Sequence, residues 1–141
     1  MSYPEQVGGT HYKADVQHWD VMEGADIAYL EATASKYIVR WRKKGGPQDL
    51  EKAATYLERA LVEERPARRL VPVDQLKALV DENRLDPWDA ALLELIHLDG
   101  SQVALRSAAA ILREKAASEQ EITGLQERLR EPRAAVAEDR R

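Results

Sequence analysis

Cysteine is absent from the 141 residues of this chain. Its absence excludes disulfide bonds, thiolate metal sites and cysteine nucleophiles together, and it fits a reducing compartment. No apolar run approaches the roughly 20 residues that a membrane-spanning helix needs, and the first residues lack the basic and apolar regions of a signal peptide. We therefore expect a cytoplasmic protein that has no membrane partner.

An excess of basic residues is also missing, because Lys and Arg total 21 against 25 Asp and Glu, which gives a net charge of -4. Proteins that bind duplex nucleic acid or an anionic membrane carry positive charge over a broad surface. The composition therefore argues against duplex nucleic acid as a partner. Any site for an anion must be local.

Two motifs of enzyme chemistry are missing as well. The chain has no Gly-x-x-x-x-Gly-Lys-Ser/Thr sequence, so it has no Walker P-loop. Its three histidines lack a zinc spacing such as His-Glu-x-x-His, and we predict no metal site built by the protein alone. Four acids are candidate ligands for a Mg²⁺ ion that arrives with a nucleotide, namely Glu23, Asp26, Glu31 and Asp49. Helix capping explains Asp26 and Asp49 equally well.

Strand patterns are absent, and the spacing of apolar residues predicts an all-α fold. Helices are expected over residues 19–23, 27–44, 47–64, 73–83, 87–98 and 101–130. Gly24, Gly45 and Gly100 are placed to end helices, with Gly45 in the left-handed conformation. Gly46 and Pro47 then begin the third helix, so the second and third helices form an antiparallel hairpin.

The N-terminal ends of two other helices carry signals. Asp26 is a candidate first-turn acid for the helix at 27–44, while Asp86 and Pro87 fit the N-cap and first position of the helix at 87–98. The basic, proline-containing segment 65–72 predicts an exposed linker. It separates a nucleotide-binding region, residues 1–64, from a helical oligomerisation region, residues 73–131, and from a disordered tail, residues 132–141.

Helical periodicity gives the helix at 27–44 an apolar face, which consists of Ile27, Leu30, Ala34, Ile38 and Trp41. Phenylalanine is absent, so Trp19, Trp41 and Trp88 are expected to anchor the core. His18 is expected to cover the core, and His97 to be a hydrogen-bonded core or interface histidine. The helix at 101–130 repeats small and apolar residues in 4-3 spacing, which favours a homo-oligomer: Ala104, Ala108, Ile111, Ser118, Ile122, Leu125 and Leu129.

The opposite face of the helix at 27–44 is basic. Lys36, Arg40 and Lys43 recur at i, i+4 and i+7, so their charged ends converge. Neighbouring cations repel one another unless an anion lies between them, although pairing with surface acids is the simpler alternative. Rings and hydroxyls that suit a base and a sugar flank this face, on Tyr29, Tyr37 and Tyr56. The pattern predicts a pocket for a phosphorylated ligand.

Upstream of this face, Gly8 and Gly9 precede Thr10, His11 and Tyr12. The backbone N–H groups of paired glycines and an imidazole can add to an anion site, with His11 as acid, base or phosphate carrier. A flexible turn followed by a structural histidine is the alternative.

At these residues the chain resembles a small bacteriophage family, long catalogued as a domain of unknown function and often described as nucleotide kinases. The resemblance covers about residues 6–62, and the chain departs from the pattern at His18, where proline is usual. The matching residues are Gly8, Gly9, His11, Tyr12, Gln17, Trp19, Asp20, Lys36, Tyr37, Arg40, Lys44, Gly45, Asp49, Leu50, Lys52, Ala53, Tyr56 and Leu57.

The resemblance implies a phage-encoded nucleotide-binding protein of the host cytoplasm, with nucleoside monophosphate kinase activity but no P-loop. The residues that it implicates are His11, Tyr12, Lys36, Tyr37, Arg40, Lys44, Asp49 and Lys52. The resemblance and the residue patterns together give one candidate nucleotide and phosphate site, with His11 as its candidate catalytic residue: Gly8, Gly9, His11, Tyr12, Lys36, Tyr37, Arg40, Lys43, Lys44, Asp49, Lys52 and Tyr56.

Three functions remain open on these patterns. The first is phosphoryl transfer between nucleotides, with Mg²⁺ as a candidate cofactor. The second is binding without turnover, in which the same pocket sequesters a nucleotide or a cyclic nucleotide immune signal as an anti-defence device. The third is a structural interaction protein that acts through its C-terminal helix.

Overall fold

The computed structural model describes residues 16–63 and 68–139, with side chains described as far as residue 130. Every regular element in these ranges is a helix, which confirms the predicted all-α class. The elements are α1 (His18–Gly24), α2 (Tyr29–Arg40), α3 (Pro47–Val62), α4 (Val73–Glu82), α5 (Pro87–Glu94), the π-helix η2 (Leu95–Asp99) and α6 (Gln102–Asp139).

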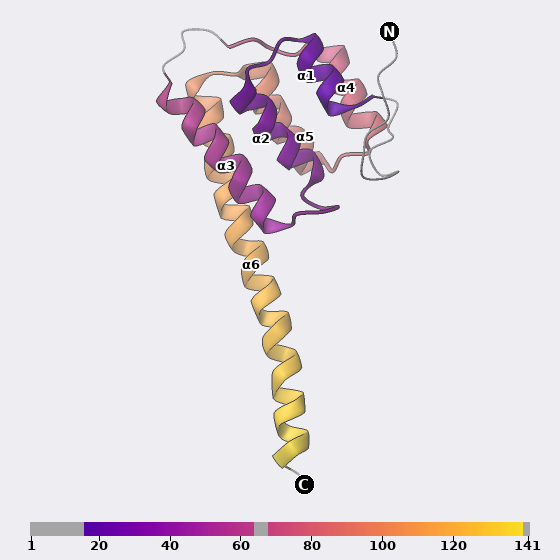
Figure 1. Cartoon of the computed structure of the whole chain (residues 1–141), viewed down its shortest axis with the longest axis vertical. Coiled ribbons are helices and arrows are strands. Elements are labelled where there is room, and N and C mark those ends of the chain that lie inside the picture. The colour runs from indigo at the N-terminus through magenta and orange to yellow at the C-terminus, as the bar shows by residue number, and fades with distance from the viewer. Residues whose placement is uncertain (1–15, 64–67, 140–141) are drawn as a thin grey trace.

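The helices form a head and a stalk (Figure 1). Helices α1 to α5 gather in the head together with the first part of α6, and the rest of α6 runs out of the head as a single extended helix. Helices α2 and α3 lie antiparallel, and α3 and the first part of α6 pack side by side. No helix in the described part of the chain is both long and apolar enough to cross a membrane.

One hydrophobic core holds the head together, and it draws on helices from both sides of residues 64–67. Ala34, Ile38 and Trp41 of the predicted apolar face are buried in it. Trp19 is 44 % exposed, so its predicted role as a core anchor is wrong. The largest fully buried apolar side chains are Ile38, Leu50, Leu57, Leu76, Leu79, Leu92, Leu93, Ile96, Leu105 and Leu112.

The predicted Asp86 cap and the predicted helix end at Gly100 are confirmed, and the role predicted for Asp26 is wrong. The Asp86 carboxylate accepts a hydrogen bond from the Trp88 N–H at 2.8 Å, with Pro87 in the first turn of α5. Gly100 follows η2 with φ of 66° in the left-handed region. Asp26 does not cap α2, because the N-cap residue is Ala28. Asp26 instead has φ of 55° in the preceding turn.

The turn between α2 and α3 is longer than predicted. Helix α2 ends at Arg40, not Lys44, and turns follow, in which the Gly46 N–H donates to the Trp41 carbonyl at 2.8 Å. The positive φ belongs to Gly46, at 58°, so its assignment to Gly45 is wrong. With ψ of -147°, Gly46 occupies a region that is essentially restricted to glycine, and it also serves as the N-cap of α3.

Two further segments differ from the predictions. Helix α6 continues past Pro132 to Asp139, where a disordered tail was predicted. In the predicted linker, Val71 is 2 % exposed and its N–H donates to the His97 carbonyl at 2.9 Å. The side chain of Arg68 is 5 % exposed. This part of the linker therefore packs onto the head and is not an exposed connection.

Candidate functional site

A paired arginine and aspartate join the ends of α2 and α3. Arg40 donates from Nε to one oxygen of Asp49 at 2.9 Å and from a terminal nitrogen to the other oxygen at 3.2 Å. Asp49, a candidate site residue in the sequence, is 1 % exposed. Both carboxylate oxygens face the guanidinium, so Asp49 orients Arg40 and lies too deep to contact a ligand in this conformation.

Gly45 leaves room for this pair. A Cβ atom at residue 45 would overlap the carboxylate carbon and both oxygens of Asp49. The glycine that sequence periodicity explained as a helix end is therefore required by the close approach of a side chain.

Replacing Gly45 with Ala is expected to lower the free energy of unfolding by about 1–3 kcal/mol, as overpacking typically does, because the buried Asp49 carboxylate must move away from Arg40. Urea denaturation of the purified variant measures this change. Gly24→Ala is the matched control, since nothing lies within 4 Å of its added Cβ atom, and a change within about 0.5 kcal/mol is expected there. Equal behaviour of the two variants would contradict the packing argument.

Three tyrosines line the same side of the hairpin. Tyr37 of α2 and Tyr56 of α3 stack with ring centroids 6.0 Å apart and an interplanar angle of 18°. Tyr29 meets Tyr56 edge to face at 6.3 Å. Tyr29 is 71 % exposed, so its ring is open to a partner from solvent. Neighbouring Tyr29 raises the pKa of the Tyr56 hydroxyl, with smaller effects from desolvation and from Tyr37, so Tyr56 stays a neutral hydrogen-bonding group near pH 7.

Three cations from two helices converge on one of these rings. Lys36 Nζ lies 4.8 Å from the Tyr37 centroid, and the Arg40 guanidinium carbon also lies 4.8 Å from it. Lys52 Nζ approaches the same ring from α3 at 5.4 Å. We call this set the tyrosine–cation surface, which consists of Tyr29, Lys36, Tyr37, Arg40, Lys52 and Tyr56.

The charge of this surface is only partly balanced. Asp49 pairs with Arg40. Among residues 16–63 and 68–130, no carboxylate forms an ion pair with Lys36 or Lys52. Among the described residues, the ammonium groups of Lys36 and Lys52 are therefore available to bind an anion, although the protein as a whole has a net charge of -4.

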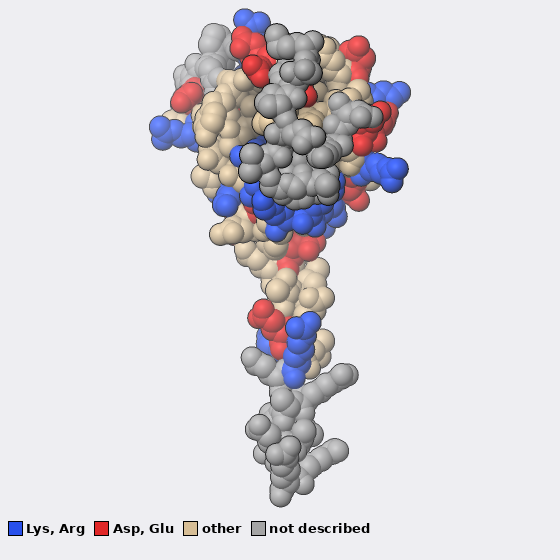
Figure 2. Space-filling view, turned by 45° about the vertical axis from the view of Figure 1, so that its right-hand side comes forward, with Lys and Arg blue, Asp and Glu red and all other residues tan. Residues whose placement is uncertain are grey.

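The remaining predicted cations lie in the turn. Lys43 and Lys44 are exposed, and neither contacts the Tyr37 ring within the described contacts. Figure 2 shows Lys and Arg side chains gathered at the lower end of the head, above the stalk. The turn between α2 and α3 also lies toward this end in Figure 1. The predicted Gly8, Gly9, His11 and Tyr12 lie outside the described residues.

One acid that sequence reasoning missed holds the hairpin in place. Asp89 of α5 is 2 % exposed and accepts hydrogen bonds from Trp41 Nε1 and Arg42 Nε, both at 2.9 Å. This carboxylate fixes the end of α2, next to Arg40. The sequence offered one signal, an acid in the first turn of a helix opened by Asp86.

The described histidines are structural. His18 Nε2 hydrogen-bonds Ser35 Oγ at 2.5 Å, and burial together with the charge of Lys36 lowers its pKa to about 4. His97 is 1 % exposed, as predicted, but neither ring nitrogen has a hydrogen-bond partner among the described residues, so the prediction of a hydrogen-bonded histidine is wrong. Burial, with a smaller effect from His18, lowers the pKa of His97 to about 3.

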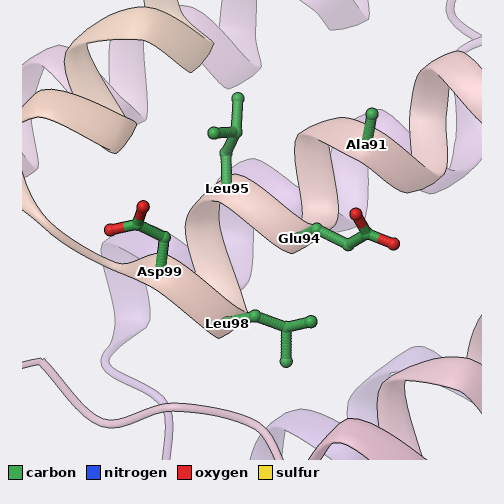
Figure 3. A pocket seen from close by; sticks show the side chains of 5 residues that line it. All are labelled: Ala91, Glu94, Leu95, Leu98 and Asp99. Atoms are coloured by element: carbon green, nitrogen blue, oxygen red, sulfur yellow. The ribbon is translucent and has the colours of Figure 1, made fainter.

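A second surface feature lies on α5 and η2. It is an open hollow of about 650 Å³ lined by Ala91, Glu94, Leu95, Leu98 and Asp99 (Figure 3). Its two carboxylates would repel a phosphate, and it shares no residue with the tyrosine–cation surface. In residues 16–63 and 68–130, no group of three or more His, Asp or Glu side chains is placed to hold a metal ion.

The geometry thus gathers cations and aromatic rings on α2 and α3. Residues 5–58 match the model of a family described as a protein of unknown function (DUF3310). The match covers α1, α2 and most of α3, and so includes the whole tyrosine–cation surface. It agrees with the extent of the predicted resemblance, but the family's description names no activity. No curated protein and no solved structure matches the chain.

Proposed function

We propose that the tyrosine–cation surface binds a nucleotide. The observation that carries this proposal is the convergence of three cations from two helices on the Tyr37 ring, where Lys36 and Lys52 form no ion pair with a carboxylate of the described residues. Such a cluster is costly for the free protein, and a bound phosphate would relieve the repulsion between its members.

Each part of the surface suits one part of a nucleotide. Lys36 and Lys52 provide point charges for phosphate oxygens, and Arg40 is held in a fixed direction by Asp49. Exposed Tyr29 offers a ring on which a base can stack, and such stacking contributes about 1–3 kcal/mol per base. A phosphate alone would use the cations but not the rings, so the aromatic residues favour a nucleotide over inorganic phosphate.

Binding without turnover is the form of the function that the geometry supports best. Asp49 is committed to Arg40, and the described residues provide no cluster of ligands for Mg²⁺. Support for nucleoside monophosphate kinase activity, for a bacteriophage origin and for a place in the host cytoplasm comes only from the resemblance over about residues 6–62. The proposal therefore takes sequestration of a nucleotide, including a cyclic nucleotide signal, as its first form and phosphoryl transfer as its second.

Titration calorimetry with nucleoside mono-, di- and triphosphates and cyclic dinucleotides tests binding. We expect one class to bind, and we expect Lys36→Ala and Lys52→Ala each to weaken its affinity about tenfold, the loss of one charge-assisted contact. Lys77→Ala on α4 is the matched control, because Lys77 is exposed and lies away from the tyrosine–cation surface. The nucleotide affinity of this variant should equal that of the unmodified protein. Affinity should also fall with added salt.

Thermal melting across the same panel separates binding from a purely structural role. A ligand at 100 times its dissociation constant adds about 2.7 kcal/mol of stability, which raises the melting temperature measurably. Unchanged melting temperatures with every nucleotide would contradict the proposal and favour the structural alternative.

Incubation with labelled ATP, Mg²⁺ and each deoxynucleoside monophosphate tests phosphoryl transfer. Binding without labelled product would leave sequestration as the function.

A further inference from the structure

The stalk carries an apolar stripe that the described chain leaves uncovered. Helix α6 packs on the head through side chains that are nearly fully buried, the last of which is Ala116. Beyond it, Ile122 and Leu125 are each 47 % exposed and Leu129 is 71 % exposed. The last described contact between α6 and α3 joins Gln120 to Glu51 at 2.9 Å. Past this contact the helix runs alone (Figure 1).

The spacing of the exposed residues is that of a coiled-coil seam. Ser118, Ile122, Leu125 and Leu129 follow one another at intervals of four, three and four, which keeps them on one side of a helix. An isolated helix with such a stripe in water exposes apolar area that a second helix can bury. The other side of the same segment is polar, so a partner would approach from the seam.

We propose that the stalk pairs with the stalk of a second copy of this chain, antiparallel, over residues 118–129. In this register Ile122 of each copy packs against Leu125 of the other, and Ser118 of each packs against Leu129 of the other. The pairing has a two-fold axis between residues 123 and 124, so the same surface is used by both copies. The proposal does not rest on nucleotide binding.

The charged residues beside the seam favour a second copy of the chain as the partner, in the antiparallel orientation. In the antiparallel register Glu121 of each copy lies beside Arg128 of the other, which gives two complementary pairs. Within residues 118–129 a parallel register would instead place Glu121 beside Gln126, which is uncharged, and would form no complementary pair. The stripe and its flanks are thus self-complementary in one direction only.

The absence of cysteine makes the register directly testable by cross-linking. In the antiparallel register a cysteine at residue 118 lies next to one at residue 129 of the other copy. Two residues 118 are then about 16 Å apart along the axis, well beyond the Cα separation of about 7 Å that a disulfide tolerates. We expect a mixture of Ser118→Cys and Leu129→Cys chains to form a disulfide-linked dimer under mild oxidation, and neither variant alone to do so. Cross-linking of Ser118→Cys with itself would overturn the antiparallel register.

Exchange of charges tests the partner's identity without touching the apolar seam. Glu121→Arg, or Arg128→Glu, places like charges beside each other twice per dimer. We expect sedimentation equilibrium to show a dimer dissociation constant that is raised about tenfold or more. The double variant restores both pairs and should recover the dimer. Glu127→Arg is the matched control, because residue 127 lies on the far side of the helix from the seam, and it should leave the dimer unchanged.

Circular dichroism of each variant verifies that the helices are intact, since all three exchanged residues are exposed. A chain that stays monomeric at every concentration up to about 1 mM, where even associations as weak as about -4 kcal/mol are populated, would overturn the proposal. Failure of the double variant to recover the dimer would overturn the pairing of Glu121 with Arg128.

Discussion

Replacing Arg68 with Met is expected to lower the free energy of unfolding by about 3–5 kcal/mol, the usual cost of removing one partner of a buried ion pair. Arg68 Nε lies 3.2 Å from Glu31 Oε1, and the two side chains are 5 % and 4 % exposed. A second guanidinium nitrogen donates to the Ala60 carbonyl at 3.1 Å. Arg68 therefore connects α2 to α3, and its loss leaves the Glu31 carboxylate buried without its guanidinium partner.

A cavity of about 190 Å³ adjoins this pair and is lined by both residues. Since a water molecule occupies about 30 Å³ of liquid, this cavity can hold water that hydrates the Glu31 carboxylate in the Arg68→Met variant. The loss of unfolding free energy is therefore expected near the lower end of the range. Replacing Glu31 with Leu in the same chain removes the buried charge. The double variant is therefore expected to recover most of the loss, as apolar replacements of buried pairs often do.

Urea denaturation at pH 7 compares these variants with a matched control. Arg69→Met removes the neighbouring arginine, which pairs with Asp26 at 3.2 Å, but those side chains are 71 % and 82 % exposed. An exposed pair contributes about 0–1 kcal/mol, so the control should be almost as stable as the unmodified protein. Similar losses for Arg68→Met and Arg69→Met would show that burial does not govern the role of Arg68.

Local signals predicted the helices well because those signals act within a few residues. The periodicity that buries Ala34, Ile38 and Trp41 is a property of α2 alone. The Asp86 cap and the Gly100 helix end depend equally on short-range hydrogen bonds and backbone conformation. All of these features could be placed without knowledge of the neighbouring elements.

The errors arise where a residue's environment comes from a distant part of the chain. Asp49 looks like a first-turn acid of α3 until α2 brings Arg40 against it. Arg68 sits among prolines and charges that suggest a linker, and only the packed head supplies Glu31 as its partner. The early end of α2 shows the same effect, because the turn that follows it lets Trp41 reach the buried Asp89 on α5.

The candidate site was predictable to the same extent. Lys36 and Arg40 share one helix, so their spacing placed them on one face, and they do lie over one ring. Lys43 was added by continuing that periodicity, but α2 ends at Arg40 and Lys43 lies in the turn. Lys52 came from the resemblance alone, since no periodicity within α2 could bring a side chain of α3 to Tyr37.

A second large effect is expected from acid. His18 and His97 have pKa values lowered to about 4 and about 3 in the folded chain. Both values lie below the value of about 6.5 that histidine has in an unfolded chain. The unfolded state therefore binds protons first as the pH falls. The stability that neutral histidines provide is complete above about pH 6.5 and is lost progressively toward pH 4 and below.

The loss should be large enough to measure well before the carboxylates titrate. Each histidine costs about 1.4 kcal/mol per pH unit below 6.5, so at pH 5 each lowers the free energy of unfolding by about 2 kcal/mol and the two together by about 4 kcal/mol. Denaturation curves in urea between pH 7.5 and pH 5 give this dependence directly.

His97→Leu separates one histidine from all other titrating groups. The ring nitrogens of His97 have no hydrogen-bond partner among the described residues, so leucine should fill the site without leaving a buried polar group, and the variant should be no less stable at pH 7. As the pH falls to 5, the variant should gain about 2 kcal/mol relative to the unmodified protein, because it no longer has to keep a buried imidazole neutral. A stability difference between the two proteins that stays constant from pH 7.5 to pH 5 would show that His97 titrates normally, and hence that it is not sealed in the core.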